Sequence, residues 1–291
     1  MGVRIPLSTP VEDVDADDPR LARHRRNWLV AGIGPAGQAR MRAARVLVVG
    51  AGGLGSPVLL YLAAAGVGTL GVCDSDVVEV TNLARQLLHG EADVGMAKPE
   101  SAARRLGALD ASVRVEQFGN VTRDFLDARG AEWDLVIDCT DNFAAKYLVA
   151  DWCADSGVPL VWGTVVSMGF QVSVFWSRPP AGVPATTLRM VYPHVPPPGT
   201  TPASPQVGVL GSVVGQAGTA MATEATKLIT GVGEPLIGRA LVADAARNRY
   251  SVLTFAAGPD GSDSSADRSG RPDRFDGPDS SARHDATGDT P

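Results

Sequence analysis

The sequence has few cysteines, and their spacing builds neither a disulfide framework nor a zinc site. Three cysteines, at positions 73, 139 and 153, are spread over 291 residues and form no Cys-x-x-Cys pair. A disulfide-rich scaffold and a four-thiolate zinc site are therefore excluded. We expect reduced thiols, a cytoplasmic location and no zinc.

An excess of positive charge is also missing. The formal net charge is −6, but residues 1–20 and 256–291 together hold 13 of the 32 acidic residues and 6 of the 26 basic ones. The rest of the chain, with 20 basic and 19 acidic residues, is nearly neutral. Nucleic-acid-binding proteins use a basic surface to collect phosphates, so we expect no nucleic-acid partner.

No segment has the pattern of a membrane span or a signal peptide. Val46–Cys73 is uncharged for 28 residues, which by length alone could cross a bilayer. Seven glycines and Pro57 divide this run into a strand, a turn, a helix and a second strand. The acidic start of the chain also lacks the basic and apolar regions of a signal peptide. We therefore expect no membrane partner.

The two ends of the chain are poor in large apolar residues. Residues 256–291 are almost entirely Gly, Ser, Asp, Arg, Pro and Ala, and residues 1–20 are similar. Such segments bury too little apolar surface to offset the entropy lost on ordering. We expect a disordered N-terminus over 1–20, one folded domain over 21–255 and a disordered acidic tail over 256–291.

Within the expected domain, short apolar runs alternate with helical stretches. Strands that are apolar throughout are typical of a sheet buried on both faces. The alternation predicts an α/β fold with a Rossmann-like, doubly wound, mainly parallel sheet. The expected strands are Arg45–Gly50, Thr69–Cys73, Val113–Gln117, Asp134–Cys139 and Pro159–Trp162, and the expected helices are Ser56–Ala65, Lys98–Ala108 and Ala144–Asp155.

The second half of the chain departs from this alternation. We expect Thr164–Trp176 to form one long antiparallel strand and Ala240–Phe255 to form a hairpin, so the C-terminal strands are expected to be antiparallel. Residues 177–209 hold nine of the 21 prolines, which predicts a mobile, proline-rich crossover loop. Gly211–Thr230 then has the small residues of a helix.

A glycine-rich turn follows the first expected strand. Gly50-Ala-Gly-Gly-Leu-Gly55 precedes a helix with Pro57 in its first turn, which is the context of the Gly-x-Gly-x-x-Gly fingerprint. Such a turn lets the backbone approach a phosphate, and the helix N-terminus supplies free N–H groups. Asp74 lies 24 residues after Gly50, where a carboxylate can accept both ribose hydroxyls. These features predict a nucleotide site without choosing between a dinucleotide and ATP.

Two cations and a further carboxylate favour ATP. Breaking the α,β bond of ATP needs positive charge on developing anionic oxygens and a carboxylate that holds Mg²⁺, whereas redox cofactors need few cations there. Arg85 and Lys98 are the expected cations, and Asp141, just after a strand, is the expected magnesium ligand. Each alone also fits a structural role: a solvated arginine, a lysine at a helix start, an aspartate capping a helix. Their joint order is the specific signal.

Several motifs occur in a fixed order along the chain: Gly50-x-Gly52-Gly53-x-Gly55, Asp74-x-Asp76, Asn82-Leu-x-Arg85-Gln86, Lys98, Asp138-Cys-Thr-Asp141-Asn142, Gly208-Val-Leu-Gly211 and Glu224-Ala-Thr-Lys227. This set resembles the ThiF/MoeB family of ATP-dependent adenylyltransferases, relatives of the ubiquitin-activating enzymes. The likeness runs from Arg23 to Phe255.

The resemblance implies a homodimer that uses ATP and Mg²⁺ to adenylate the C-terminal Gly-Gly of a ubiquitin-like sulfur-carrier protein of the ThiS/MoaD type. The reaction would serve thiamine, molybdopterin or related biosynthesis and release pyrophosphate. Because a carboxylate is already ionised at neutral pH, positioning and charge neutralisation would carry it. The implied catalytic residues are Arg85, Lys98, Asp141 as the magnesium ligand, and Arg26 reaching into the partner subunit; the implied nucleotide-binding residues are Gly50, Gly52, Gly53, Gly55, Asp74, Asp76, Asn82, Arg85, Gln86, Lys98, Asp141 and Asn142.

Three departures from the family pattern change these expectations. The N-terminal motif occurs as Arg23-His-Arg-Arg-Asn27, an imperfect match. The two Cys-x-x-Cys pairs of many members are missing. Ser204 stands where many relatives have a loop cysteine, and a serine cannot form the thioester or persulfide of that cysteine. We expect the chemistry to stop at the adenylate and a separate sulfurtransferase to deliver sulfur.

Two alternatives remain at this point. A nicotinamide-dependent oxidoreductase would share the glycine turn, and it would be indifferent to loss of Arg85. A non-catalytic dimer would bind ubiquitin-like proteins without releasing pyrophosphate.

Overall fold

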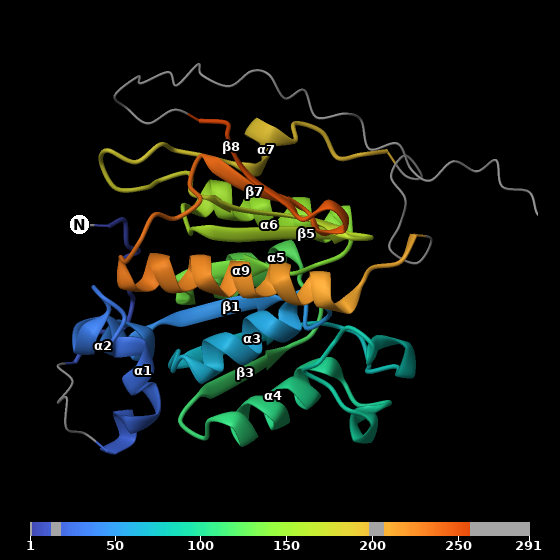
Figure 1. Cartoon of the computed structure of the whole chain (residues 1–291), viewed down its shortest axis with the longest axis horizontal. Helices are drawn as coiled ribbons and strands as arrows, with labels where there is room; N and C mark the ends of the chain where they lie inside the picture. Colours follow the sequence, from blue (N-terminus) through green and yellow to red (C-terminus); the bar gives the residue numbers. More distant parts are fainter. Residues whose placement is uncertain (1, 13–18, 198–206, 257–291) are drawn as a thin grey trace, which may run out of the picture.

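One sheet of eight strands forms the centre of the molecule (Figure 1). The computed structural model describes residues 2–12, 19–197 and 207–256. The spatial order is β3-β2-β1-β4-β5-β6-β7-β8, with β1 to β5 parallel and β6 to β8 antiparallel. The predicted fold class, with its antiparallel C-terminal strands, is confirmed. The strands are β1 (Arg45–Val49), β2 (Thr69–Cys73), β3 (Arg114–Phe118), β4 (Leu135–Asp138), β5 (Leu160–Val166), β6 (Gly169–Phe175), β7 (Arg239–Asp244) and β8 (Arg249–Thr254).

Helices cover both faces of this sheet. Alternate residues of β1 belong to different cores: Val46 and Val48 pack with α3 and α9, and Leu47 and Val49 pack with α6. This two-sided burial explains why the inner parallel strands β1, β2 and β4 are almost entirely apolar, whereas the edge strand β3 carries charged and partly exposed residues. The α-helices are α1 (Arg25–Trp28), α2 (Gly34–Ala43), α3 (Gly55–Ala64), α4 (Lys98–Leu109), α5 (Arg123–Arg129), α6 (Phe143–Ser156), α7 (Leu188–Val191) and α9 (Gly211–Thr230).

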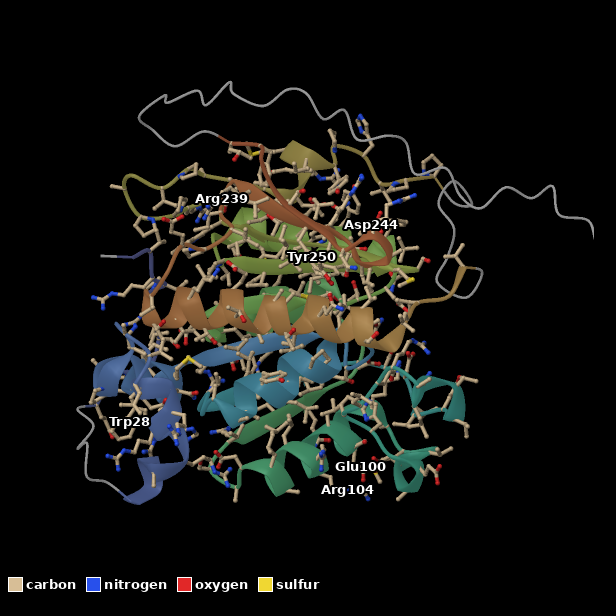
Figure 2. The ribbon with its side chains drawn as sticks, in the orientation of Figure 1. Trp28, Glu100, Arg104, Arg239, Asp244 and Tyr250 are labelled. Carbon is tan, nitrogen blue, oxygen red and sulfur yellow. The ribbon has the colours of Figure 1, made fainter. Side chains whose placement is uncertain are left out.

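The helix α4 is amphipathic, with apolar residues on its buried face and charged residues on its exposed face. Ala102 and Leu106 are fully buried against the sheet, while Glu100 and Arg104 are exposed on the opposite side of the helix (Figure 2). Apolar residues spaced four apart lie on one face of a helix. The first residue of α4, Lys98, is thereby held at the end of a firmly packed helix.

The strand order creates a crevice beside β1. The chain passes from β1 to β2 and β3 on one side, then to β4 and β5 on the other. Val49, Cys73 and Asp138 are register neighbours at the carboxyl ends of three adjacent strands. Open α/β sheets bind ligands at such a switch point, so the loops after β1, β2 and β4 form one candidate site.

The stretch from Thr164 to Trp176 is not the single long strand expected from the sequence. It contains the end of β5 and all of β6, which pair in an antiparallel hairpin with Val166 opposite Gly169. Ser167 occupies the turn with φ of 54°, a left-handed conformation that serine seldom adopts. A two-residue turn without an Asn-Gly or Asp-Gly signature left no signal in the sequence.

The expectation of disorder over residues 1–20 is wrong for residues 2–12. Ile5 is buried in the main core, and its backbone N–H donates to the carbonyl of Leu228 at 2.9 Å. Arg40 donates to the Ile5 carbonyl at 2.6 Å, and the Ser8 N–H donates to Asp134 at 2.6 Å. Val3 and Leu7 pack against the same core, so three apolar side chains and these hydrogen bonds hold the segment in place.

Other expectations fall partly outside the described residues. The proline-rich crossover of residues 177–209 contains the short helix α7, but residues 198–206 are not described. The same holds for Met1, residues 13–18 and nearly all of the expected acidic tail. Among the described helices, none is both long and apolar enough to cross a bilayer.

Candidate functional site

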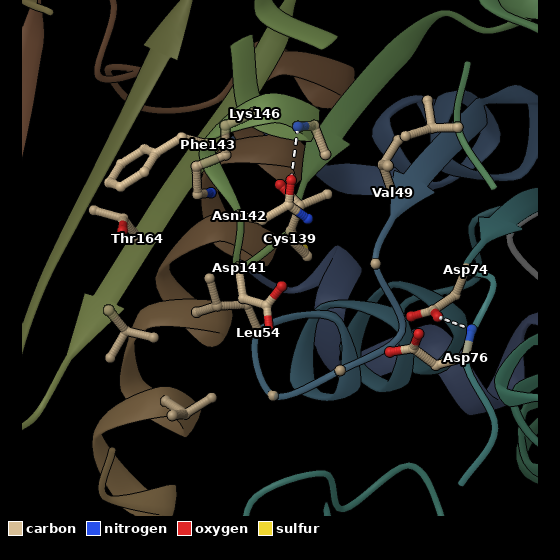
Figure 3. Close-up of a pocket in the computed structure, with 18 of the residues that line it drawn as sticks. Val49, Leu54, Asp74, Asp76, Cys139, Asp141, Asn142, Phe143, Lys146 and Thr164 are labelled. Carbon is tan, nitrogen blue, oxygen red and sulfur yellow. Dashed lines mark hydrogen bonds between the residues drawn. The ribbon is translucent and has the colours of Figure 1, made fainter. Parts of the chain in front are cut away.

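A pocket of about 630 Å³ opens at the carboxyl ends of β1, β2, β4 and β5 (Figure 3). A volume of several hundred Å³ suits a nucleotide-sized ligand. Arg85, Lys98 and Asp141, which lie far apart in the sequence, all line this one pocket. So do Gly50, Gly52, Gly53, Asp74, Asp76, Gln86 and Asn142.

The glycine turn is shaped by steric limits. Gly50 has φ of 98°, and a Cβ at this position would lie 2.8 Å from the carbonyl oxygen of Cys139. A Cβ on Gly53 would lie 2.8 Å from a methyl of Val214. No side chain caps the N-terminus of α3, which starts at Gly55. Its first N–H groups are the kind of donors that bind phosphate oxygens.

Asp74, directly after β2, fixes the backbone of the glycine turn through a hydrogen bond to Ala51. One carboxylate oxygen accepts from the Ala51 N–H and the other from the Asp76 N–H, both at 2.8 Å. Each carboxylate oxygen has a second lone pair, so these bonds leave Asp74 able to accept ribose hydroxyls. The residue therefore fits its expected role and also fixes the backbone that would carry the phosphates.

The two expected cations are held differently. Lys98 is largely buried, and its Nζ lies 2.7 Å from a carboxylate oxygen of the exposed Asp76. Arg85 is half-buried and donates from one Nη to the Thr81 carbonyl at 2.9 Å. Both side chains are thus anchored at the pocket wall, where their charge can neutralise phosphate oxygens.

The loop after β4 presents Asp141 and Asn142. The Asp141 carboxylate is exposed and makes no hydrogen bond or ion pair with any residue that the structure describes. Asn142 caps α6 by accepting from the Ala145 N–H at 2.8 Å. A free carboxylate at the pocket mouth fits Mg²⁺, which is commonly held by one or two carboxylates together with substrate phosphates. Within the described ranges no group of three or more His, Cys, Asp or Glu side chains is arranged so that it could hold a metal ion by itself.

Sequence reasoning missed Lys146, a buried residue of the pocket wall (Figure 3). Its Nζ donates to Asp138 at 3.0 Å and to the Gly163 carbonyl at 2.6 Å, and it lies 5.5 Å from the centre of the Trp162 ring. Asp138 is fully buried and accepts from both the N–H and the hydroxyl of Thr140. This network shapes the loop that carries Asp141. The one available signal was that Lys146 is among only three lysines.

Gln86 is a second buried polar group of the pocket. Its side chain is 4% exposed, and its Oε1 has no hydrogen-bond partner among the described residues. The amide lies next to Gly52: a Cβ there would be 3.5 Å from the Gln86 Nε2. Buried amides normally find partners, so this group suits a polar ligand over the glycine turn.

Three expected site residues do not line the pocket. Gly55 is buried, and a Cβ there would overlap the carbonyl oxygen of Gly50, so this glycine serves close packing of the turn. Asn82 is buried, and its side chain accepts from the Glu79 N–H at 3.1 Å, which supports the turn leading to Arg85. Arg26 is exposed on α1. This helix lies near the C-terminal end of α3, whereas the glycine turn precedes the N-terminal end of α3 (Figure 1).

The three cysteines are poor nucleophiles in this fold. Cys73 and Cys139 contribute to the pocket wall, and all three thiols are buried and unpaired. Burial, aided by the Asp74 charge, raises the pKa of Cys73 to about 12. Burial likewise raises the pKa of Cys139 and Cys153. The reactive thiolate is therefore scarce at neutral pH. Ser204, the residue in place of the family's loop cysteine, lies outside the described residues.

Comparisons with known proteins give the family. The model of the ThiF family matches residues 24–263. A probable adenylyltransferase/sulfurtransferase MoeZ of Mycobacterium tuberculosis is 44% identical over 256 residues, covering 87% of this chain and 64% of the relative, so the chain spans less than two thirds of that protein. A sulfur carrier protein adenylyltransferase of Thermus thermophilus is 42% identical over 240 residues, 82% of this chain and 89% of the relative.

A solved structure agrees on the fold. MccB of E. coli, in complex with MccA-N7isoASN, has a TM-score of 0.70 and 21% identity, and the match covers 82% of this chain and 73% of MccB. The ordered motifs, the family model and the relatives agree with the resemblance found in the sequence. The chain belongs to the ThiF family.

Proposed function

We propose that this protein adenylates the C-terminal glycine of a ubiquitin-like sulfur-carrier protein of the ThiS/MoaD type. The observation that carries the proposal is the convergence of Arg85, Lys98 and Asp141 on one pocket around the glycine turn. The activity in the name of the Thermus thermophilus relative, sulfur carrier protein adenylyltransferase, supports it. A redox dinucleotide site would not need these two cations.

In the proposed reaction, the terminal carboxylate of the carrier attacks the α-phosphorus of ATP. The bond from that phosphorus to the oxygen bridging to the β-phosphorus breaks, so pyrophosphate leaves and an acyl adenylate remains. The glycine turn and the start of α3 bind phosphate oxygens through N–H groups, and Asp74 binds the ribose. Arg85 and Lys98 neutralise the charge that develops on the leaving pyrophosphate.

Asp141 is the proposed ligand of Mg²⁺, with Asn142 beside it. When bound, Mg²⁺ would supply further neutralisation of phosphate charge. Gln86 and Asp76 complete the proposed nucleotide-binding set, the first through its unpaired amide oxygen and the second by orienting Lys98.

Exchange of labelled pyrophosphate into ATP tests the proposal. We expect exchange that requires Mg²⁺ and a carrier ending in Gly-Gly, and that is lost when the two glycines are deleted. Asp141→Ala is expected to abolish it and Arg85→Ala to reduce it strongly. Binding of NAD without binding of ATP would refute the proposal, as would tight carrier binding with no exchange at saturating ATP and Mg²⁺.

We further propose a homodimer in which Arg26 acts in the partner's site. Arg26 is remote from its own pocket, and the turn that follows its helix α1 exposes Leu29 (70%) and Val30 (51%). Tyr61, 59% exposed, lies with Val30 at a hollow of about 410 Å³ between α1, α3 and α9. Sedimentation analysis should show a dimer. Mixing Arg26→Ala with Asp141→Ala should restore exchange, because a mixed dimer contains one intact site.

Sulfur delivery is proposed to need a separate sulfurtransferase. The three cysteines of the chain are buried thiols, and Ser204 lacks the sulfur chemistry of the loop cysteine. Adenylated carrier should therefore accumulate until such an enzyme is added. We propose the cytoplasm as the location, since unpaired cysteines suit a reducing compartment.

A further inference from the structure

A buried histidine connects the glycine turn to the helix that starts with Lys98. His89 is 7% exposed. Its Nε2 lies 2.9 Å from the Ala51 carbonyl oxygen, inside the glycine turn, and its Nδ1 lies 2.7 Å from the hydroxyl of Ser101. Ser101 is fully buried in α4, one turn after Lys98. The ring thus bridges two elements of the proposed nucleotide site.

The protonation state of this bridge follows from its surroundings. Burial lowers the pKa of His89, and the nearby charge of Lys98 lowers it further, against opposing effects of its bond to Ala51 and of the Asp74 charge. A neutral ring has one N–H. The Ala51 carbonyl can only accept, so Nε2 carries the proton and Nδ1 accepts from the Ser101 hydroxyl.

The hydrogen bond from His89 is the second of two side-chain hydrogen bonds to the backbone of Ala51. The N–H of Ala51 donates to Asp74 at 2.8 Å, and its carbonyl accepts from His89. Gly50 on one side and Gly52 on the other lack the side chains that would restrict the backbone. The backbone N–H and the backbone carbonyl of Ala51, which lies between two glycines, are therefore both held by side chains.

Resting on the proposed function, we infer that His89 is a positioning residue, which clamps the glycine turn against α4 and so sets the distance between the phosphate-binding backbone and Lys98. The clamp acts before any ligand arrives. Without it, binding of a triphosphate must order the turn and lose the corresponding entropy, so affinity falls. His89 itself touches neither the phosphates nor the carrier.

Calorimetric titration with ATP and Mg²⁺, without a carrier, measures the effect on affinity. His89→Ala should raise the Kd for ATP about tenfold, as expected for a lost buried hydrogen bond and a looser turn. His89→Gln should stay within about threefold of the unaltered protein, because its amide N–H can still reach the Ala51 carbonyl. Ser101→Ala removes the other end of the clamp and should raise the Kd by an intermediate factor.

Ser173→Ala is the matched control for Ser101→Ala. Ser173 is equally buried, and its hydroxyl donates to the Arg239 carbonyl at 2.8 Å, on β6 away from the pocket. It should lose stability without a change in the Kd for ATP. Hydrogen exchange of the backbone amides of residues 50–54, measured without ligand, should be faster in His89→Ala and unchanged in Ser173→Ala.

The outcomes separate this inference from the proposed function. Equal Kd values for His89→Ala and His89→Gln, or for Ser101→Ala and Ser173→Ala, would overturn the clamp. If the unaltered protein binds no ATP, the proposed function fails, while the exchange of residues 50–54 still tests the clamp. Should His89→Ala not fold, the Kd for ATP of Ser101→Ala is compared with that of His89→Gln and of Ser173→Ala, and equal values would overturn the clamp.

Discussion

Replacing Lys146 with methionine is expected to be among the most destabilising changes in this protein. Methionine keeps most of the side-chain volume but removes the ammonium group, which leaves Asp138 buried without its positive partner. The two side chains are 5% and 0% exposed, so water cannot replace the lost contact. Breaking one half of a buried ion pair costs about 3–5 kcal/mol, and the Gly163 carbonyl also loses its 2.6 Å donor.

Urea unfolding at pH 7 measures this loss of stability. The double variant Asp138→Asn with Lys146→Met should be less destabilised than the sum of the two single variants, since the uncompensated charge is gone. Arg123→Met is the control, because Arg123 forms an exposed pair with Asp127 and such pairs contribute little. If Lys146→Met and Arg123→Met lower the free energy of unfolding equally, the argument from burial is wrong.

Three further predictions concern packing, thiol reactivity and pH. Gly55→Ala should lower the free energy of unfolding by about 1–3 kcal/mol through overpacking. Gly107 is an exposed helix position with open space around it, so Gly107→Ala should raise the free energy of unfolding by about 0.5–1 kcal/mol. Equal effects of the two variants in urea unfolding would contradict the steric reasoning. Cys73, with its pKa raised to about 12, should not react with a thiol reagent in the folded protein between pH 7 and 9, and rapid labelling detected by mass spectrometry would refute its burial. Burial lowers the pKa of His24 and of His89, so the unfolded chain takes up protons first and thermal stability should fall as pH drops below about 6.5; a melting temperature that rises over this range would show the sign to be wrong.

The fold class could be predicted from the sequence because the central strands β1, β2 and β4 are almost entirely apolar and the glycine turn is distinctive. Arg85, Lys98 and Asp141 could be predicted as members of one site from the order of their motifs along the chain, and Asp141 also from its place just after a strand of a parallel sheet. The exact partners could not be predicted. The pairing of Lys146 with Asp138 joins α6 to β4, and its geometry depends on how the helix packs over the sheet.

Other features gave weak or misleading signals. The helix α2 contains Gly34 and Gly37, residues with low helix propensity, and was not expected. The alternate residues Val3, Ile5 and Leu7 pack against the core, but the acidic residues that follow them led to an expectation of disorder for the whole of residues 1–20. Nothing in the sequence marks His89, because neither of its partners, Ala51 and Ser101, belongs to a recognisable polar motif. Local patterns identify elements, whereas these contacts exist only after the elements have packed.

The crowding of the glycine turn has a consequence for engineering. A methyl group at Gly50, Gly53 or Gly55 would meet Cys139, Val214 or the turn's own backbone. These three positions therefore leave no space for a larger side chain in variants designed to bind a different nucleoside triphosphate. Variation would have to enter through the neighbouring loops after β2 and β3, where Ser75 and Asn120 are exposed at the rim and can change without displacing the backbone beneath them.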